Sequence, residues 1–175
     1  MWKTVIIVVV VLLAAVLVAA AMRPDDFSVQ RSVSIKAPPD KIYPMLVDFR
    51  QWPAWSPWEK LDPDMKRTLS GPASGPGASY EWQGSGKVGA GRMEIKEAAV
   101  PTKVAIQLDF IKPFEGHNVT DFTLVPRGEQ TEVTWLMHGP APFVSKLMGL
   151  FVDMDKMIGK DFEAGLANLK AATEK

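Results

Sequence analysis

The sequence predicts an α+β fold, in which a curved antiparallel sheet wraps around a long C-terminal helix, preceded by an N-terminal transmembrane helix. Three observations predict this fold. An uncharged apolar segment opens the chain, short alternating segments separated by glycine and proline fill the middle, and apolar residues recur every three to four positions near the C-terminus. Because 175 residues suit one domain with a short appendage, we expect no second domain.

The first segment has the length and composition of a membrane span. Residues 4–22 carry no charge, and as a helix they would extend roughly 28 Å, close to the hydrocarbon thickness of a bilayer. Trp2, Lys3 and Arg23 suit the two interfaces. Ala19 to Ala21 also fits a signal-peptide cleavage site, so a removed signal peptide is the alternative, but the apolar run is longer than a usual signal core.

We therefore expect a single-pass protein of the bacterial inner membrane. Residues 1–23 would form the membrane-spanning segment, 24–26 a linker and 27–175 the domain. The cation at Lys3 favours an inside N-terminus and hence a periplasmic domain, although Arg23 places the same charge on the other flank.

Composition excludes several classes of function. Lys plus Arg and Asp plus Glu are both 20, so no net positive field would hold a nucleic acid. There is no cysteine, which excludes disulfides, thiolate nucleophiles and Cys-ligated metals. The two histidines, His117 and His138, stand in no recognisable ligand spacing. We expect neither a metal nor a cofactor.

The domain begins with a strand followed directly by a helix. Alternation of Phe27, Val29, Val33 and Ile35 predicts the strand, with Arg31 on the same apolar side. The prolines of Ala37–Asp40 end it, and apolar spacing predicts a helix over 41–49. The next segment, 52–58, combines three indoles with two prolines, which indicates a short packed turn region.

The rest of the chain alternates strands with turns and ends in a helix. Strands are expected at 78–83, 91–98, 103–111, 119–126 and 131–138, as an antiparallel meander with one buried face. After Pro140 and Pro142, apolar residues recur at helical spacing from Phe143 to Leu169. One long amphipathic helix would cover the buried face.

Three stretches carry a resemblance to a known family. They are APPDKIYPMLVDFRQWPAWSPW at 37–58, the glycine-rich strands of 75–91, and 143–169 with its core MDKMIGKDFEAGLANL. The chain resembles the START-like (SRPBCC) superfamily, in its polyketide cyclase/dehydrase-type branch, over nearly all of 27–175. The resemblance implies a helix-grip fold around a cavity. Cyclases, lipid carriers, hormone receptors and chaperone activators share that fold, so it does not determine an activity.

A cavity between sheet and helix would be the ligand site, and its inward side chains are the candidate contacts. The residues expected to line it are Arg31, Met93, Ile106, Leu108, Trp135, Met137, Phe151, Met154 and Met157. Ordinary core packing would explain the apolar members equally well. Arg31 is more informative, because an inward cation must be paired or contact an anionic ligand. Glu81 and Glu94 are conceivable partners.

The sequence therefore predicts a membrane-tethered module that binds a hydrophobic or amphipathic small molecule, such as a lipid. One alternative is a cyclase-, dehydratase- or hydrolase-type enzyme with His138, Arg31 or Tyr43 in the cavity, although no catalytic motif is recognisable. Another is a protein-interaction module resembling chaperone-ATPase activators, which would use exposed indoles. Those indoles would be Trp52, Trp55 and Trp58.

Overall fold

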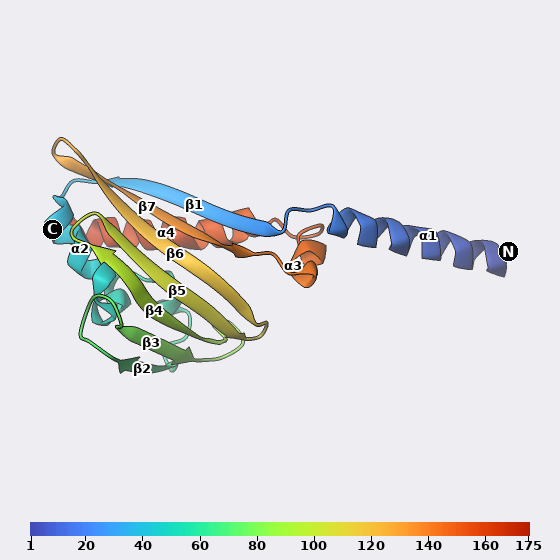
Figure 1. Ribbon diagram of the computed structural model, residues 1–175, viewed down its shortest axis with the longest axis horizontal. Coiled ribbons are helices and arrows are strands. Elements are labelled where there is room, and N and C mark those ends of the chain that lie inside the picture. Colours follow the sequence, from blue (N-terminus) through green and yellow to red (C-terminus); the bar gives the residue numbers. More distant parts are fainter.

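The computed structural model describes residues 1–175 and contains one seven-stranded antiparallel sheet with helices against its inner face (Figure 1). The elements in chain order are α1 (Trp2–Ala21), β1 (Asp26–Ile35), α2 (Pro39–Val47), the 3₁₀ helices η1 (Phe49–Ala54) and η2 (Pro57–Lys60), β2 (Lys66–Ser70), β3 (Ser79–Gln83), β4 (Ala90–Ala99), β5 (Lys103–Lys112), β6 (Gly116–Arg127), β7 (Gln130–Pro140), α3 (Phe143–Met148) and α4 (Met154–Thr173). The predicted α+β fold is confirmed.

Strands β2 to β7 form a meander, and β1 pairs with β7 as the edge strand on that side of the sheet. Its order is β1-β7-β6-β5-β4-β3-β2, and every neighbouring pair is antiparallel. Sequence analysis missed only β2, at the edge of the sheet. All five residues of β2 are exposed, so the strand has no buried face that an apolar alternation could have indicated.

The expected long C-terminal helix is divided in two. α3 stops at Met148, and α4 begins after Asp153, whose carboxylate accepts a hydrogen bond from the Lys156 amide at 3.1 Å. This capping bond satisfies a free amide of the first turn and starts a new helix. The sequence pattern did not reveal this interruption, because Phe151 in the connecting turn is apolar and stands at the spacing of a helix. Its side chain is nevertheless 75% exposed.

The core between sheet and α4 is unusually aromatic. The rings of Trp135 on β7 and Phe162 on α4 stack with centroids 4.0 Å apart and planes 6° from parallel. Trp52 and Trp55 are buried, and their indoles donate hydrogen bonds to the Leu46 and Met45 carbonyls. The predicted packed turn region is therefore confirmed. The alternative that exposed indoles at Trp52 and Trp55 form an interaction surface is wrong.

α1 extends away from the sheet as a single helix (Figure 1). It is long and apolar enough to span a membrane, with a mean hydropathy of 3.2 and little burial within the molecule. Near its end it contacts α3, and Ala20 is fully buried.

Candidate functional site

The sheet brings five predicted cavity residues together on its inner face. Met93 lies opposite Leu108 across β4 and β5, and Ile106 lies in the next row of the same strand pair. On the other side of β6, Met137 of β7 continues the row of Ile106, and Trp135 lies one row further along β7. All five are at least nine-tenths buried. They form one apolar layer beneath the helices, which we call the inner floor.

Polar side chains of β6 lie within the inner floor. Thr120 is opposite Ile106 on β5 and Met137 on β7, and Asn118 is opposite Leu108. The Thr120 hydroxyl Oγ1 and the Trp135 indole Nε1 are both buried without a hydrogen-bond partner. A buried polar group left unpaired costs about 1–3 kcal/mol, so these two atoms are available for a polar group of a ligand.

Sequence analysis missed Thr120 and Asn118, although a signal was present. On β6, these two residues alternate with outward residues and share their side with Phe122 and Leu124. An inward Asn or Thr between large apolar residues departs from the strand pattern, as Arg31 does on β1.

The three candidates from the C-terminal region do not join the inner floor. Phe151 and Met157 are 75% and 52% exposed, and Met154 is half-buried. The large side chains of α4 that are buried in the core are Phe162, Leu166 and Leu169, and Ile158 packs partly against the same core.

Arg31 lies on the inner side of β1 but binds α4 rather than the floor. Its guanidinium donates hydrogen bonds to the Asp155 carboxylate at 3.0 and 3.1 Å and to Glu163 at 2.8 Å. The guanidinium lies directly over Gly159, where any β-carbon would collide with it. The hydrogen bond from Arg31 lowers the pKa of Asp155.

The expected partners of Arg31 are therefore wrong. Glu81 and Glu94 pair with Arg92 on β4 instead, at 3.6 and 3.3 Å. They lie on the outer face of the sheet, whereas Arg31 is on the inner face of the opposite edge strand. Two helix carboxylates thus neutralise the cation, and Arg31 fastens α4 to β1.

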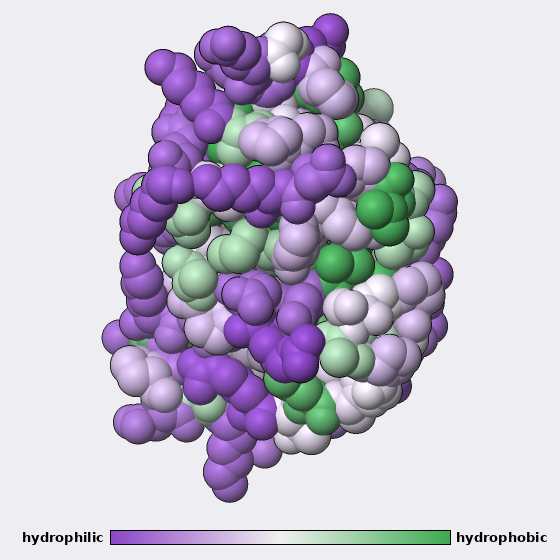
Figure 2. Space-filling model, turned by 90° about the vertical axis from the view of Figure 1, so that its left-hand side faces the viewer, coloured by the Kyte–Doolittle hydropathy of each residue, from purple (hydrophilic) through white to green (hydrophobic).

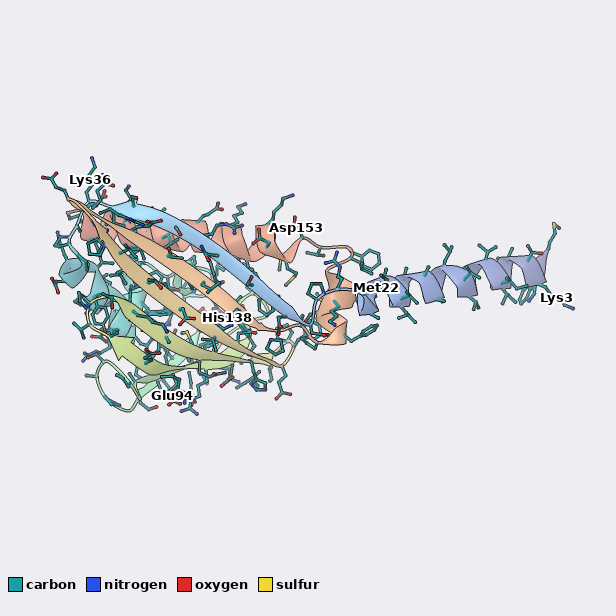
Figure 3. The ribbon with its side chains drawn as sticks, turned by 45° about the horizontal axis from the view of Figure 1, so that its top comes forward. Lys3, Met22, Lys36, Glu94, His138 and Asp153 are labelled. Carbon is teal, nitrogen blue, oxygen red and sulfur yellow. The ribbon has the colours of Figure 1, made fainter.

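The polar groups of the enzyme alternative do not share a site. His138 lies on the outer face of β7, with its Nε2 3.3 Å from the Asp121 carboxylate (Figure 3). Tyr43 belongs to α2, its hydroxyl is buried without a partner, and burial raises its pKa. Arg31 is held by α4. The sheet separates His138 from the inner floor, so His138 and the other two groups do not converge on one point.

Two hollows of the surface lie away from the inner floor. One, of about 100 Å³, is bounded by η1 and the turn between β2 and β3, including Asp48 and Gly71. The other, of about 400 Å³, is wide open and is lined only by polar residues and a glycine, such as Asp62 and Gln83. Neither offers an apolar surface comparable to that between sheet and α4, which the Trp135–Phe162 stack fills.

Comparison with protein families identifies the group to which this chain belongs. Residues 26–174 match the family described as polyketide cyclase/dehydrase and lipid transport. The chain belongs to this family. The match covers every element of the sheet together with α4, and it confirms the START-like resemblance. Comparison with curated proteins found no match.

Solved structures similar to this family member share its fold. The major latex-like protein 151 of Panax ginseng superposes with a TM-score of 0.62 at 13% identity, covering 87% of this chain and 100% of its own. The Aha1 dimer of Colwellia psychrerythraea gives 0.61 at 20%, covering 85% and 96%. Protein CV1439 of Chromobacterium violaceum gives 0.61 at 14%, covering 87% and 99%. At these identities the likeness concerns the fold alone.

Proposed function

We propose that this protein is a membrane-tethered binding module for a hydrophobic or amphipathic small molecule, held between the inner floor and α4. The family description includes lipid transport, and the floor is an apolar layer of suitable chemistry. α1 would keep the domain beside a reservoir of such molecules.

The observation that carries the proposal is the pair of unpartnered polar atoms in the floor. Trp135 Nε1 can only donate a hydrogen bond, and Thr120 Oγ1 can donate or accept one. Binding sites for small molecules combine an apolar lining with a few such groups, which orient the ligand. The matching ligand has an apolar body and a carbonyl or hydroxyl group. Asn118, 7% exposed in the adjoining row, offers a further amide.

Binding requires displacement of part of α4. The stack of Phe162 on Trp135 occupies the space over the floor. The first two turns of α4, residues 154–161, are the part least held by the core, because their only fully buried residue is Gly159. Arg31 is the main polar attachment of these two turns to β1, through Asp155. An apolar ligand would enter where they separate from the sheet.

Native mass spectrometry of the full chain tests the proposal. The protein is incubated with a mixture of fatty acids and phospholipids and then released from detergent micelles in the spectrometer. We expect a retained adduct on the wild type and a weaker one on Thr120→Val, which removes the hydroxyl but keeps the shape. Thr123→Val is the matched control, since Thr123 lies on the exposed side of the same strand. A wild type that retains none of these molecules would contradict the proposal.

A further inference from the structure

An apolar surface lies beside the end of α1. Its side chains come from α3 and from the turn that follows it, and they are 39% to 75% exposed. We call this the α3 surface; it consists of Phe143, Val144, Met148, Phe151 and Val152. Five large apolar side chains exposed over ten consecutive positions are unusual for a surface that contacts only water.

α3 is fastened to α1 rather than freely tethered. The two helices are in contact, Ala20 is fully buried, and Val16, one turn earlier, is half-buried. The Lys146 ammonium of α3 pairs with the Asp25 carboxylate between α1 and β1. The Asp25 carbonyl also accepts a hydrogen bond from the Ala141 amide at 2.6 Å. Figure 3 shows α3 next to Met22, at the end of α1.

These contacts determine the depth of α3 relative to the span. A helix rises 1.5 Å per residue, so Val16 lies roughly 7 Å before the end of α1 at Ala21. Because α3 contacts α1, whose buried or half-buried positions are Val16 and Ala20, α3 lies at the level of the last turns of the span. In a bilayer spanned by α1, that level is the boundary between headgroups and acyl chains.

We propose that the α3 surface inserts into the bilayer interface next to α1 and holds the domain in one orientation on the membrane. The proposal rests on the proposed function only in requiring that α1 is retained in a membrane. Short amphipathic segments lie at this boundary by burying their apolar side among the acyl chains. The opposite end of the molecule differs, because hydrophilic residues dominate there and apolar ones form only separate patches (Figure 2).

The orientation gives the binding site a direct path to lipid. α4 begins at Met154, two residues after the α3 surface ends, and residues 154–161 are the part that would separate from the sheet. Met157 in this part is 52% exposed. A molecule leaving the bilayer would meet these first turns of α4 without crossing water.

Spin labels on single cysteines test the proposal, because the natural chain contains no cysteine. The full chain is reconstituted into vesicles of phosphatidylcholine and phosphatidylglycerol, and each label is exposed to oxygen, which concentrates in lipid, or to a water-soluble nickel complex. Val144→Cys and Phe151→Cys probe the α3 surface. Val100→Cys, in the turn between β4 and β5 at the far end of the sheet, is the matched control, since Val100 and Phe151 are both 75% exposed. Val10→Cys probes the middle of α1.

We expect the labels at positions 144 and 151 to lose accessibility to nickel and gain collisions with oxygen relative to position 100. Nickel accessibility at 151 equal to that at 100 would overturn the proposal. Shielding of 144 and 151 from both reagents would also overturn it, because a second copy or another protein would then cover the surface. A label at position 10 outside the bilayer would refute the tether of the proposed function, whereas a buried label there with an aqueous label at 151 would refute this inference alone.

Discussion

Two single residues, Gly159 and Thr120, have large effects on the interior of this molecule. Gly159 has no β-carbon, which leaves room for the Arg31 guanidinium to lie against α4 and reach both Asp155 and Glu163. Thr120 lowers the stability of the core, because it places an unpaired hydroxyl where an apolar methyl group would fit. The first residue fastens the helix, and the second reduces stability at the proposed site.

Thr120→Val should make the unliganded protein more stable while weakening ligand binding. Replacing a buried, unpaired hydroxyl by a methyl group removes a desolvation penalty, so we expect the free energy of unfolding to rise by about 1 kcal/mol. Urea unfolding followed by tryptophan fluorescence measures this change. Thr123→Val, on the exposed side of β6, should leave stability within about 0.5 kcal/mol. A clear loss of stability in Thr120→Val would show that the hydroxyl is satisfied in solution.

The Arg31–Asp155 ion pair should make the free energy of unfolding decrease at acidic pH. Arg31 holds the pKa of Asp155 below its ordinary 3.8, and a carboxyl with a lowered folded pKa stabilises the fold above its unfolded pKa. That contribution is lost as the pH falls below 3.8 and through the folded pKa. Wild type should therefore exceed Asp155→Asn in stability at about pH 6, with the difference shrinking in acid.

Urea midpoints at several pH values measure this difference. Glu129→Gln is the control, because Glu129 is exposed and takes part in no ion pair. A difference between wild type and Asp155→Asn that stayed constant down to pH 3 would contradict the assignment.

Among the elements, α4 shows a division that its apolar spacing does not reveal. From Phe162 onward the helix is buried in the core through Phe162, Leu166 and Leu169, whereas residues 154–161 include the exposed Met157 and are paired with Arg31 through Asp155. A turn separates α4 from α3, and Asp153 at the end of this turn caps the start of α4. The helix is thus held by the core from Phe162 onward and by the Arg31–Asp155 ion pair near its start.

Phe162→Ala should be severely destabilising. The substitution removes a fully buried ring that stacks on Trp135 and leaves a cavity in the core. Changes of this kind cost about 3–5 kcal/mol, which thermal or urea unfolding would measure. Met157→Ala, in the first two turns of the same helix, should cost less than about 1 kcal/mol because the side chain is 52% exposed. Equal losses in the two variants would refute the division of α4.

For the whole molecule, the connection between α1 and the domain is structured. Asp25, within the expected linker, is tied to α3 through Lys146 and Ala141, and Arg23 lies against Gly149. Sheet, α3 and α1 therefore form a continuous unit at this end of the molecule (Figure 1).

Lys146→Ala should loosen this connection without unfolding the domain. A spin label at Met22→Cys in the full chain should gain mobility, seen as narrower lines, because the ion pair with Asp25 is lost. Lys156→Ala is the control, since Lys156 of α4 is 84% exposed and pairs only with Asp153, the residue that caps the start of α4. An unchanged line shape in Lys146→Ala would show that other contacts alone hold α1 in place.

The elements with local sequence patterns could be recognised without a structure. Alternation in β1 and β4 to β7, the proline-bounded α2 and the uncharged α1 could all be recognised, because each repeats at the period of its own backbone. The floor residues could also be predicted, since a strand that buries one face reveals that face in its alternation. The family resemblance then supplied the arrangement of sheet and helix.

Contacts between residues of different elements could not be read from the sequence and depend on how the chain folds. The partners of Arg31 are Asp155 and Glu163, more than a hundred positions away, and their meeting depends on the crossing of α4 over β1 at Gly159. The exposure of Phe151 and the unpaired state of Thr120 likewise depend on what packs opposite them. Helical spacing shows which side chains are apolar. Whether such a side chain is buried or hydrogen-bonded depends on the residues that pack against it, and a local pattern does not contain that information.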